Sequence, residues 1–169
     1  MLSVIILGDG ASAEAIVRTL APLVAAAVRG LVRDVVLAGG PGHQLATIAD
    51  HAGCGFVEAD TEAEVLAGAL AAARGDMLMF LCAGHIPEPG FFEEVEDLLA
   101  VGSPPGREAR LLRAAPESFF ERVFPLLAPV VGLIAARRRC DADRASAFMH
   151  LVASIRARRT LRRRLRRIV

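Results

Sequence analysis

The sequence contains no lysine, asparagine, tryptophan or tyrosine, so all 20 of its basic residues are arginines. We interpret this bias as the signature of a GC-rich bacterial genome and draw no chemistry from it. Cysteine is scarce as well, since only Cys54, Cys82 and Cys140 occur, widely spaced and odd in number. Such spacing fits neither a disulfide framework nor a zinc-binding pattern, and predicts reduced thiols in a cytoplasmic protein.

Long hydrophobic runs are also missing, although 54% of the residues are hydrophobic. The longest late run, Val123–Ala136, is interrupted by Pro125 and Pro129 and is shorter than the ~20 apolar residues of a membrane span. The early run Val4–Leu7 has no basic segment before it, so we interpret it as a strand and not as a signal peptide. The length of 169 residues is that of one ordinary domain and is enough for a hydrophobic core, so we expect a single domain.

The most specific nucleotide-binding and hydrolase motifs are absent. No Gly-x-x-x-x-Gly-Lys-Ser/Thr or Gly-x-Ser-x-Gly sequence occurs. The Gly8-Asp9-Gly10 turn invites a dinucleotide-binding interpretation, and Ala13, three positions after Gly10, fits the looser G-x-G-x-x-A form but not the full motif. Ala38 stands where the second strand would need a ribose-binding acid. A glycine pair in a strand–helix turn is weak evidence alone, and NAD binding is disfavoured.

Charge is distributed very unevenly along the chain. Residues 1–100 hold 4 Arg and 14 acidic residues, a net charge of −10, whereas residues 101–169 hold 16 Arg and 5 acidic residues, a net charge of +11. Such asymmetry suggests a basic tail that meets an anionic surface. The alternative is that the two parts partly neutralise each other within the fold.

The tail itself has the pattern of an amphipathic helix. At 100° per residue, four apolar residues gather on one side of the segment 156–169 and most Arg side chains take the other. The four are Ala157, Leu161, Leu165 and Ile168. This predicts a C-terminal basic helix that lies on an anionic membrane, binds an acidic protein, or packs on the acidic part of the chain. The candidate contact residues are Arg158, Arg159, Arg162, Arg163, Arg166 and Arg167. Nucleic acid is disfavoured as a partner, because no aromatic residue is interleaved to stack on bases.

Apolar runs of strand length alternate with helical patterns through residue 100. We predict strands at Leu2–Leu7, Asp34–Ala38, Gly55–Ala59 and Met77–Leu81. Helices are predicted at 12–29, 44–52, 61–74 and 89–100. This alternation favours an α/β fold with a mostly parallel sheet flanked by helices. After a Pro/Gly loop at 101–106, the pattern predicts strands at Leu111–Ala114 and Val130–Ala136 around a helix at 116–127. We expect an α/β domain at 1–140 and an Arg-rich helical tail at 141–169.

One stretch of the sequence is more informative than the rest. Residues 73–84 read A-R-G-D-M-L-M-F-L-C-A-G and are followed by Pro89. The chain opens with Ser3-Val4-Ile5-Ile6, and Gly132–Arg137 forms a later G-x-x-x-x-R stretch. In order and spacing, this sequence resembles family 2 glycosyltransferases of the GT-A type, as a compact bacterial member. The resemblance implies a GT-A fold and a nucleotide-sugar partner. The cysteines predict a cytoplasmic location, and the basic tail predicts peripheral attachment to the inner membrane as one of its alternatives.

The family's metal and nucleotide motifs are altered here. In that family the strand before the turn ends in an Asp-x-Asp or x-x-Asp motif, which holds a divalent cation on the sugar-nucleotide diphosphate. The corresponding residues are Cys82, Ala83 and Gly84. The Asp-rich turn after the second strand has Ala38 and His43 in place of both Asp. The resemblance therefore implies a degenerate site at which Mg²⁺ or Mn²⁺ is not expected, and no other cofactor is indicated.

Two interpretations of the altered site stay open. His85 either ligates a softer metal together with Cys82 or stabilises phosphate as an imidazolium; alternatively Cys82 is simply buried and His85 faces solvent. The family's acceptor base has no counterpart beyond Asp141 and Asp143, which match by position only. By resemblance, the candidate nucleotide-binding residues are Gly8, Asp9, Gly39, Gly40, Gly84 and His85.

Two functions follow from these expectations. The first is a glycosyltransferase-like protein whose sugar transfer is lost or independent of the usual divalent cation. The second is a non-catalytic interaction module that docks through its Arg-rich tail to an anionic membrane or an acidic protein. Binding of a sugar nucleotide discriminates between them.

Overall fold

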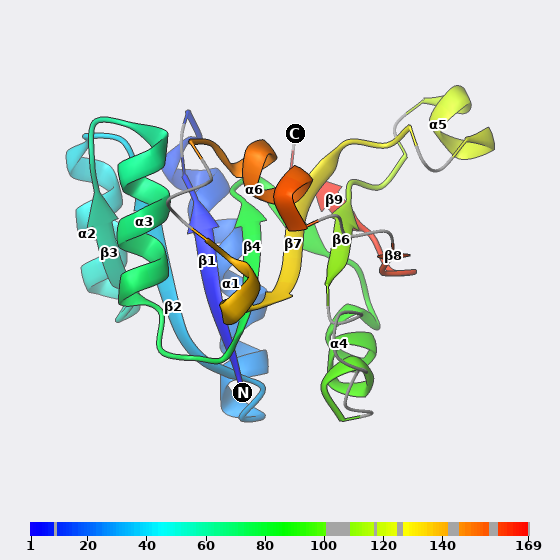
Figure 1. Ribbon diagram of the computed structural model, residues 1–169, viewed down its shortest axis with the longest axis horizontal. Helices are drawn as coiled ribbons and strands as arrows, with labels where there is room; N and C mark the ends of the chain where they lie inside the picture. The colour runs from blue at the N-terminus through cyan, green and yellow to red at the C-terminus, as the bar shows by residue number, and fades with distance from the viewer. Residues whose placement is uncertain are drawn as a thin grey trace.

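The computed structural model describes residues 1–8, 10–100, 109–116, 118–124, 127–141, 146–155 and 159–168, leaving aside the side chain of His43. A seven-stranded sheet in the order β3-β2-β1-β4-β7-β6-β8 forms the centre, and β5 pairs with β9 beside it (Figure 1). The strands are β1 Leu2–Leu7, β2 Val32–Gly39, β3 Gly55–Glu58, β4 Met77–Cys82, β5 His85–Pro87, β6 Arg110–Arg113, β7 Val130–Ala136, β8 Arg159–Thr160 and β9 Leu165–Arg167. The helices are α1 Ala13–Val28, α2 His43–Ala52, α3 Glu62–Ala72, α4 Phe91–Ala100, α5 Phe119–Val123, the 3₁₀ turn η1 Arg137–Arg139, and α6 Phe148–Ile155.

The sheet is mostly parallel, as predicted. Strand β1 pairs in parallel with both β2 and β4, and β2 pairs in parallel with β3. Strand β7 is antiparallel to β4 and to β6. Because parallel strands end at the same edge, the carboxyl ends of β1, β2 and β4 meet there, beside the start of β7. This edge is where an open α/β sheet binds ligands.

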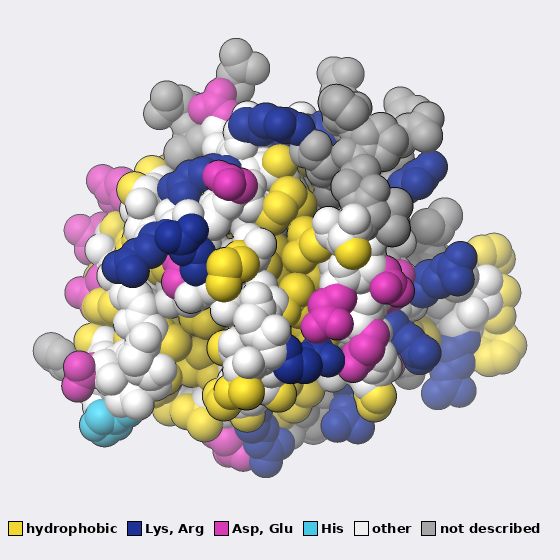
Figure 2. All heavy atoms as spheres, turned by 90° about the horizontal axis from the view of Figure 1, so that it is seen from below, with side chains coloured by type: hydrophobic (Ala, Val, Ile, Leu, Met, Phe, Trp, Pro, Cys, Tyr) yellow, Lys and Arg dark blue, Asp and Glu magenta, His cyan; other side chains and the backbone are white. Residues whose placement is uncertain are grey.

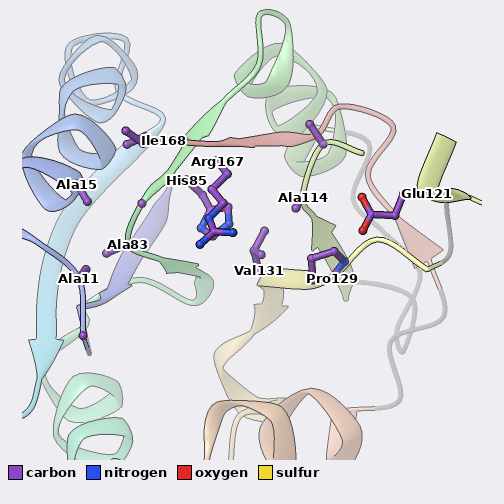
Figure 3. Close-up of a pocket in the computed structure, with 13 residues that line it drawn as sticks. Ala11, Ala15, Ala83, His85, Ala114, Glu121, Pro129, Val131, Arg167 and Ile168 are labelled. Carbon is purple, nitrogen blue, oxygen red and sulfur yellow. The ribbon is translucent and has the colours of Figure 1, made fainter. Parts of the chain in front are cut away.

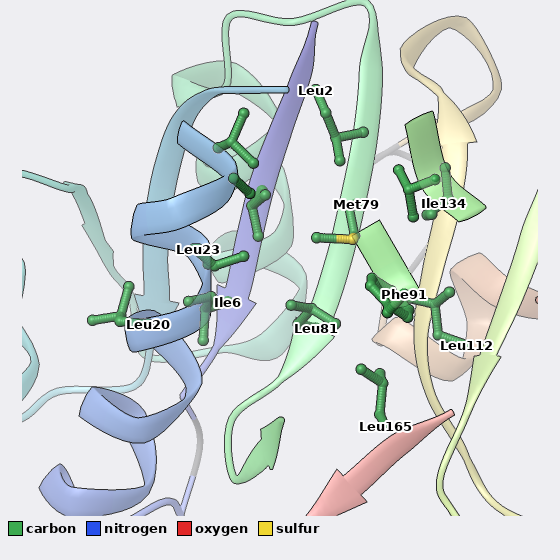
Figure 4. Packing of buried hydrophobic residues seen from close by; sticks show 14 of the residues in the cluster. Leu2, Ile6, Leu20, Leu23, Met79, Leu81, Phe91, Leu112, Ile134 and Leu165 are labelled. Carbon is green, nitrogen blue, oxygen red and sulfur yellow. The ribbon is translucent and has the colours of Figure 1, made fainter. Parts of the chain in front are cut away.

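Two hydrophobic cores cover the two faces of the sheet. Successive strand residues point to opposite faces, so Val4 and Ile6 pack towards α1 and α4, while Ile5 packs towards α3 and α6. Figure 4 shows the first core, in which Phe91 of α4 lies among residues of the central strands. Burial on both faces explains why β1 and β4 read as continuous apolar runs.

Side-chain caps begin the helices where the sequence predicts. The Ser12 side chain accepts a hydrogen bond from the Ala15 amide at 3.2 Å, and Thr61 accepts one from the Glu64 amide at 3.3 Å. Each bond satisfies an amide that has no partner within its own helix. The predicted starts of α1 and α3 are confirmed.

A polar junction fixes the opposite edge of the sheet, where β1 and β4 begin. The fully buried Ser3 hydroxyl donates to the Asp34 carboxylate and accepts from the Gly75 amide at 2.6 Å. The Arg74 amide donates to the same carboxylate at 3.1 Å. A buried hydroxyl is stable only when it is hydrogen-bonded, so this junction sets the point at which the chain enters β4.

The expected C-terminal basic helix is wrong for the described residues 159–168, which we call the strap. Here β8 pairs with β6 and β9 pairs with β5, with a turn between them. Leu161 and Leu165, spaced by one helical turn, are instead both buried in the first core, 4% and 0% exposed. A spacing of four residues suits a helix but equally suits two residues on either side of a turn. Among the described residues no helix is both long and apolar enough to cross a membrane.

Candidate functional site

Two adjoining cavities lie at the edge where β1, β2 and β4 end. The first, of about 450 Å³, lies between the start of α1, the turn after β4 and the strap. The second, of about 540 Å³, lies between the loops after β1 and β2. Gly10 and Ala11 line both. The cavities therefore form one continuous surface over the strand-end loops that the sequence singled out.

The turn after β4 forms the floor of the first cavity. Gly84 has φ of +86°, a conformation that glycine adopts readily. Its amide donates to the Thr19 hydroxyl at 2.9 Å, and that buried hydroxyl donates to the Ala15 carbonyl at 2.8 Å. The amide of Ala83 donates to the Leu7 carbonyl at 2.9 Å. The turn is thus tied to both α1 and β1.

His85 follows this turn as the first residue of β5 and lines the cavity. Its Nδ1 lies 3.2 Å from the Cys82 carbonyl oxygen. A carbonyl only accepts hydrogen bonds, so Nδ1 carries the hydrogen in this contact. The other ring nitrogen, Nε2, then becomes a donor only in the imidazolium form.

Arg167 lines the same cavity, although the sequence assigns it to a membrane or protein contact. It is the residue directly opposite His85 in the β5–β9 pair, and Figure 3 shows both side chains at the centre of the cavity wall. Residues paired in this way point their side chains to the same face. The Ile168 amide donates to the Gly84 carbonyl at 2.8 Å, which continues the pairing into the turn.

Two acidic side chains hold the backbone of the strap in place. The Glu94 carboxylate accepts from the amides of Arg162 and Arg163, each at 2.8 Å. Glu88 accepts from the Arg164 amide at 3.2 Å and pairs with the same residue through its own backbone amide at 3.1 Å. Charge-assisted bonds of this kind are stronger than neutral ones. The acidic and basic parts of the chain thus meet within the fold here.

The second cavity gathers two of the predicted glycines. Gly8 and Gly40 both line it, and a Cβ on Gly8 would lie 2.9 Å from a methyl group of Leu45. The Gly8 amide donates to the Ala38 carbonyl at 2.8 Å. Gly39 is buried at the end of β2, one residue before the loop.

Other predicted residues lie elsewhere. Asp9, Arg158 and Asp143 fall outside the described residues. Five arginines of the strap are exposed, and they are Arg159, Arg162, Arg163, Arg166 and Arg167. Asp141 follows η1 at the opposite edge of the sheet, where β4 begins beside the end of β7. Arg137, which resembles an arginine near the family's acceptor site, also lies at that edge and donates to the carbonyls of Leu70 and Ala73.

The end of β4 does not fit a hard divalent cation. Cys82, Ala83 and Gly84 offer no carboxylate, and Mg²⁺ and Mn²⁺ prefer oxygen ligands. Burial, and then the charge of Glu62, raise the pKa of Cys82 to about 11. Its thiol is therefore protonated near neutral pH. Within the described ranges, no three His, Cys, Asp or Glu side chains lie close enough to hold a metal ion.

Glu121 is a residue of the first cavity that the sequence did not single out. It lines the side of the cavity away from His85 and Arg167, beyond Pro129 in Figure 3. Its amide donates to the Ser118 hydroxyl at 3.2 Å and its carboxylate accepts from the Ser118 amide at 3.4 Å. The Ser-x-x-Glu spacing is a capping signal visible in the sequence, but it predicts a helix start and not a cavity residue.

Comparison with known proteins identifies the fold. No protein-family model and no curated protein matches the sequence. Among solved structures, glucosyl-3-phosphoglycerate synthase from Mycobacterium tuberculosis in complex with phosphoglyceric acid matches with a TM-score of 0.59 and 20% identity, over 83% of this chain and 58% of that one. A complex of the same enzyme with Mn²⁺, UDP-glucose and phosphoglyceric acid matches with a TM-score of 0.58 and 20% identity, over the same shares of the two chains.

Mannosyl-3-phosphoglycerate synthase from Rubrobacter xylanophilus matches with a TM-score of 0.57 and 17% identity, over 83% of this chain and 55% of that one. This chain thus spans less than three fifths of the length of these synthases. At such identities the likeness establishes the fold. The chain has the GT-A fold of these synthases, as the resemblance implied.

Proposed function

We propose that this glycosyltransferase-like chain binds a nucleotide sugar at the carboxyl edge of its sheet, and that its sugar transfer is lost or independent of the usual divalent cation. The observation that carries the proposal is the altered end of β4. A cavity remains beside that strand, while Cys82, Ala83 and Gly84 stand where the family has its metal-binding carboxylate.

Retention of the donor pocket is supported by the second cavity. The loops after β1 and β2 stay apart, and a space of about 540 Å³ lies between Gly8, Gly40 and Leu45. Ligand pockets of about 300–1,000 Å³ are usual for small molecules. The volume is in the range of a nucleoside site, and we place the phosphates past Gly10 and Ala11, in the first cavity.

Calorimetric titration of the protein with UDP, GDP and their common sugars, with and without Mn²⁺, tests this function. We expect one nucleotide diphosphate sugar to bind in EDTA, with no gain in affinity when Mn²⁺ is added, because the altered strand end supplies no carboxylate. A folded protein that binds none of these ligands, or binds only with Mn²⁺, would contradict the proposal.

A second candidate function is docking on an anionic membrane, and α5 favours it. Phe119, Phe120 and Phe124 are 73%, 71% and 57% exposed, and Arg122 is exposed among them. Figure 2 shows hydrophobic atoms projecting at the right edge, the side on which Figure 1 places α5, with Arg side chains beside them. Aromatic residues next to basic ones suit the interface of an anionic bilayer. The exposed Phe side chains at α5 favour a membrane over an acidic protein as the partner.

We expect the protein to bind vesicles that contain phosphatidylglycerol and not vesicles of phosphatidylcholine alone. Replacing Phe119 and Phe120 together by Ala should lower vesicle binding at least about tenfold, since a buried Phe contributes about 1.5–3 kcal/mol. Co-sedimentation measures the effect. The control is Val24→Ala, which removes apolar surface from a residue that is 64% exposed on α1. Equal losses in both variants would exclude α5 as the docking element.

A further inference from the structure

Arginines of the strap lie close to arginines of β6. Arg159 lies opposite Arg110 in the β6–β8 pair. Burial, and then the charge of Arg159, lower the pKa of Arg110, while burial and then Arg164 lower the pKa of Arg113. Like charges opposite each other destabilise a sheet.

Of the arginines in this region, Arg167 lies in the cavity. It is paired with His85, and the Ile168 amide holds the end of β9 on the Gly84 carbonyl. A guanidinium group presents several N–H donors in a planar fork that matches phosphate oxygens. The His85 ring beside it adds a second charged donor only in its protonated form. Both groups stand next to the turn at which the family's diphosphate-bound cation would lie.

We infer that Arg167 and His85 form a binding site for the diphosphate of a nucleotide sugar, in which the strap supplies directly the positive charge that a divalent cation supplies in related folds. The inference rests on the proposed function for the identity of the ligand. It goes beyond the proposed function by assigning the charge to Arg167, which lies more than 80 positions after the turn that follows β4.

Core burial and backbone hydrogen bonds hold β9 in its place beside β5. Leu165 is buried in the first core, and Glu94 holds the turn before it through two backbone bonds. Because β9 alternates, Leu165 and Arg167 point to one side and Arg166 to the other. The anchor therefore determines which side chain faces the cavity: both arginines are exposed, but Arg167 lines the cavity and Arg166 does not.

Titration of the full chain with inorganic pyrophosphate in EDTA tests this site. Arg167→Gln should lower the affinity at least about tenfold, the loss typical of a charge-assisted hydrogen bond. Arg166→Gln removes the same charge from the next residue of β9 and should change the affinity less than about threefold. Arg167→Lys should restore part of the loss. Equal losses in the two Gln variants, or no binding of pyrophosphate by the wild-type chain, would overturn the inference.

The same titrations with UDP and UDP-sugars separate this inference from the proposed function. Sugar-nucleotide binding that is unchanged by Arg167→Gln would overturn the inference and leave the proposed function standing. Pyrophosphate binding that depends on Arg167, with no tighter binding of any nucleotide diphosphate or its sugar, would support the inference and refute the proposed ligand. Inorganic phosphate binding as tightly as pyrophosphate would overturn the assignment to a diphosphate.

Discussion

Replacing Gly132 by Ala is expected to lower the free energy of unfolding by about 3 kcal/mol, at the upper end of the cost of overpacking. Gly132 lies in β7, between β4 and β6. A Cβ there would lie 2.4 Å from the Phe80 carbonyl oxygen and 2.8 Å from a methyl group of Leu112. The first contact is with backbone in the middle of the sheet, so no side-chain rotation relieves it. Chemical denaturation followed by circular dichroism measures the loss.

The matched control is Gly55→Ala on the edge strand β3. There the nearest atom to the added Cβ lies at 3.5 Å, an ordinary van der Waals contact. We expect this variant to be as stable as the wild type or slightly more stable, because Ala reduces the freedom of the unfolded chain. A loss at Gly132 no larger than the change at Gly55 would show that β7 does not run as close to β4 as described.

Leu165→Ala is expected to cost about 2–5 kcal/mol, the range for a large buried side chain cut back to Ala. Leu165 is 0% exposed in the first core, although it lies in the most basic segment of the chain. Because it precedes Arg167 on the same side of β9, the variant should also weaken pyrophosphate binding. Urea denaturation and calorimetry measure the two effects.

A free amphipathic tail predicts a different result. In that case Leu165 would face solvent or lipid, and truncating it would leave stability unchanged in the absence of vesicles. Leu127→Ala provides the comparison, since Leu127 is 66% exposed and its loss should cost less than about 0.5 kcal/mol. Equal stability of the two variants would favour the free tail over the strap.

The sequence predicts the central part of the fold well because local pattern and burial agree there. The predicted strand at Leu2–Leu7 matches β1, and the one at Met77–Leu81 differs from β4 by a single residue. Both are covered by helices on each face, so nearly every position is apolar. Ser12 and Thr61 add capping signals that depend only on neighbouring residues.

The strap could not be predicted in the same way. Strands β5, β8 and β9 have two or three residues each, too few for an alternating pattern. Their partners are set by tertiary packing, and β9 pairs with a strand about 80 positions earlier. The periodicity of the leucines was compatible with a helix, while the burial that decides against it depends on α4 and β6.

The position of several candidate residues at one edge of the sheet could be predicted from the sequence, whereas their role stays a prediction. Gly8, Gly40, Gly84 and His85 line the cavities because loops after parallel strands meet at one edge, a rule that sequence order alone can apply. The place of Arg167 depends on the β5–β9 pairing, which has no signal in the sequence. Charge composition singled out the arginines of the tail as candidates but gave no means of telling Arg167 from Arg166.

The short length of β8 and β9 also has a consequence for motion. Proteins open locally in units whose free energies range from near zero to the global value, and segments with few backbone bonds open first. The strap is joined to the body through a two-residue and a three-residue strand, whereas β1 is paired along its whole length on both sides. The buried Leu161 and Leu165 and the bonds to Glu88 and Glu94 oppose opening, but we expect the cavity wall that carries Arg167 to open at a lower free energy than the rest of the sheet. Ligand affinity at this wall is then reduced by the fraction of time it spends open, and a change that tightens the strap raises affinity without touching the ligand.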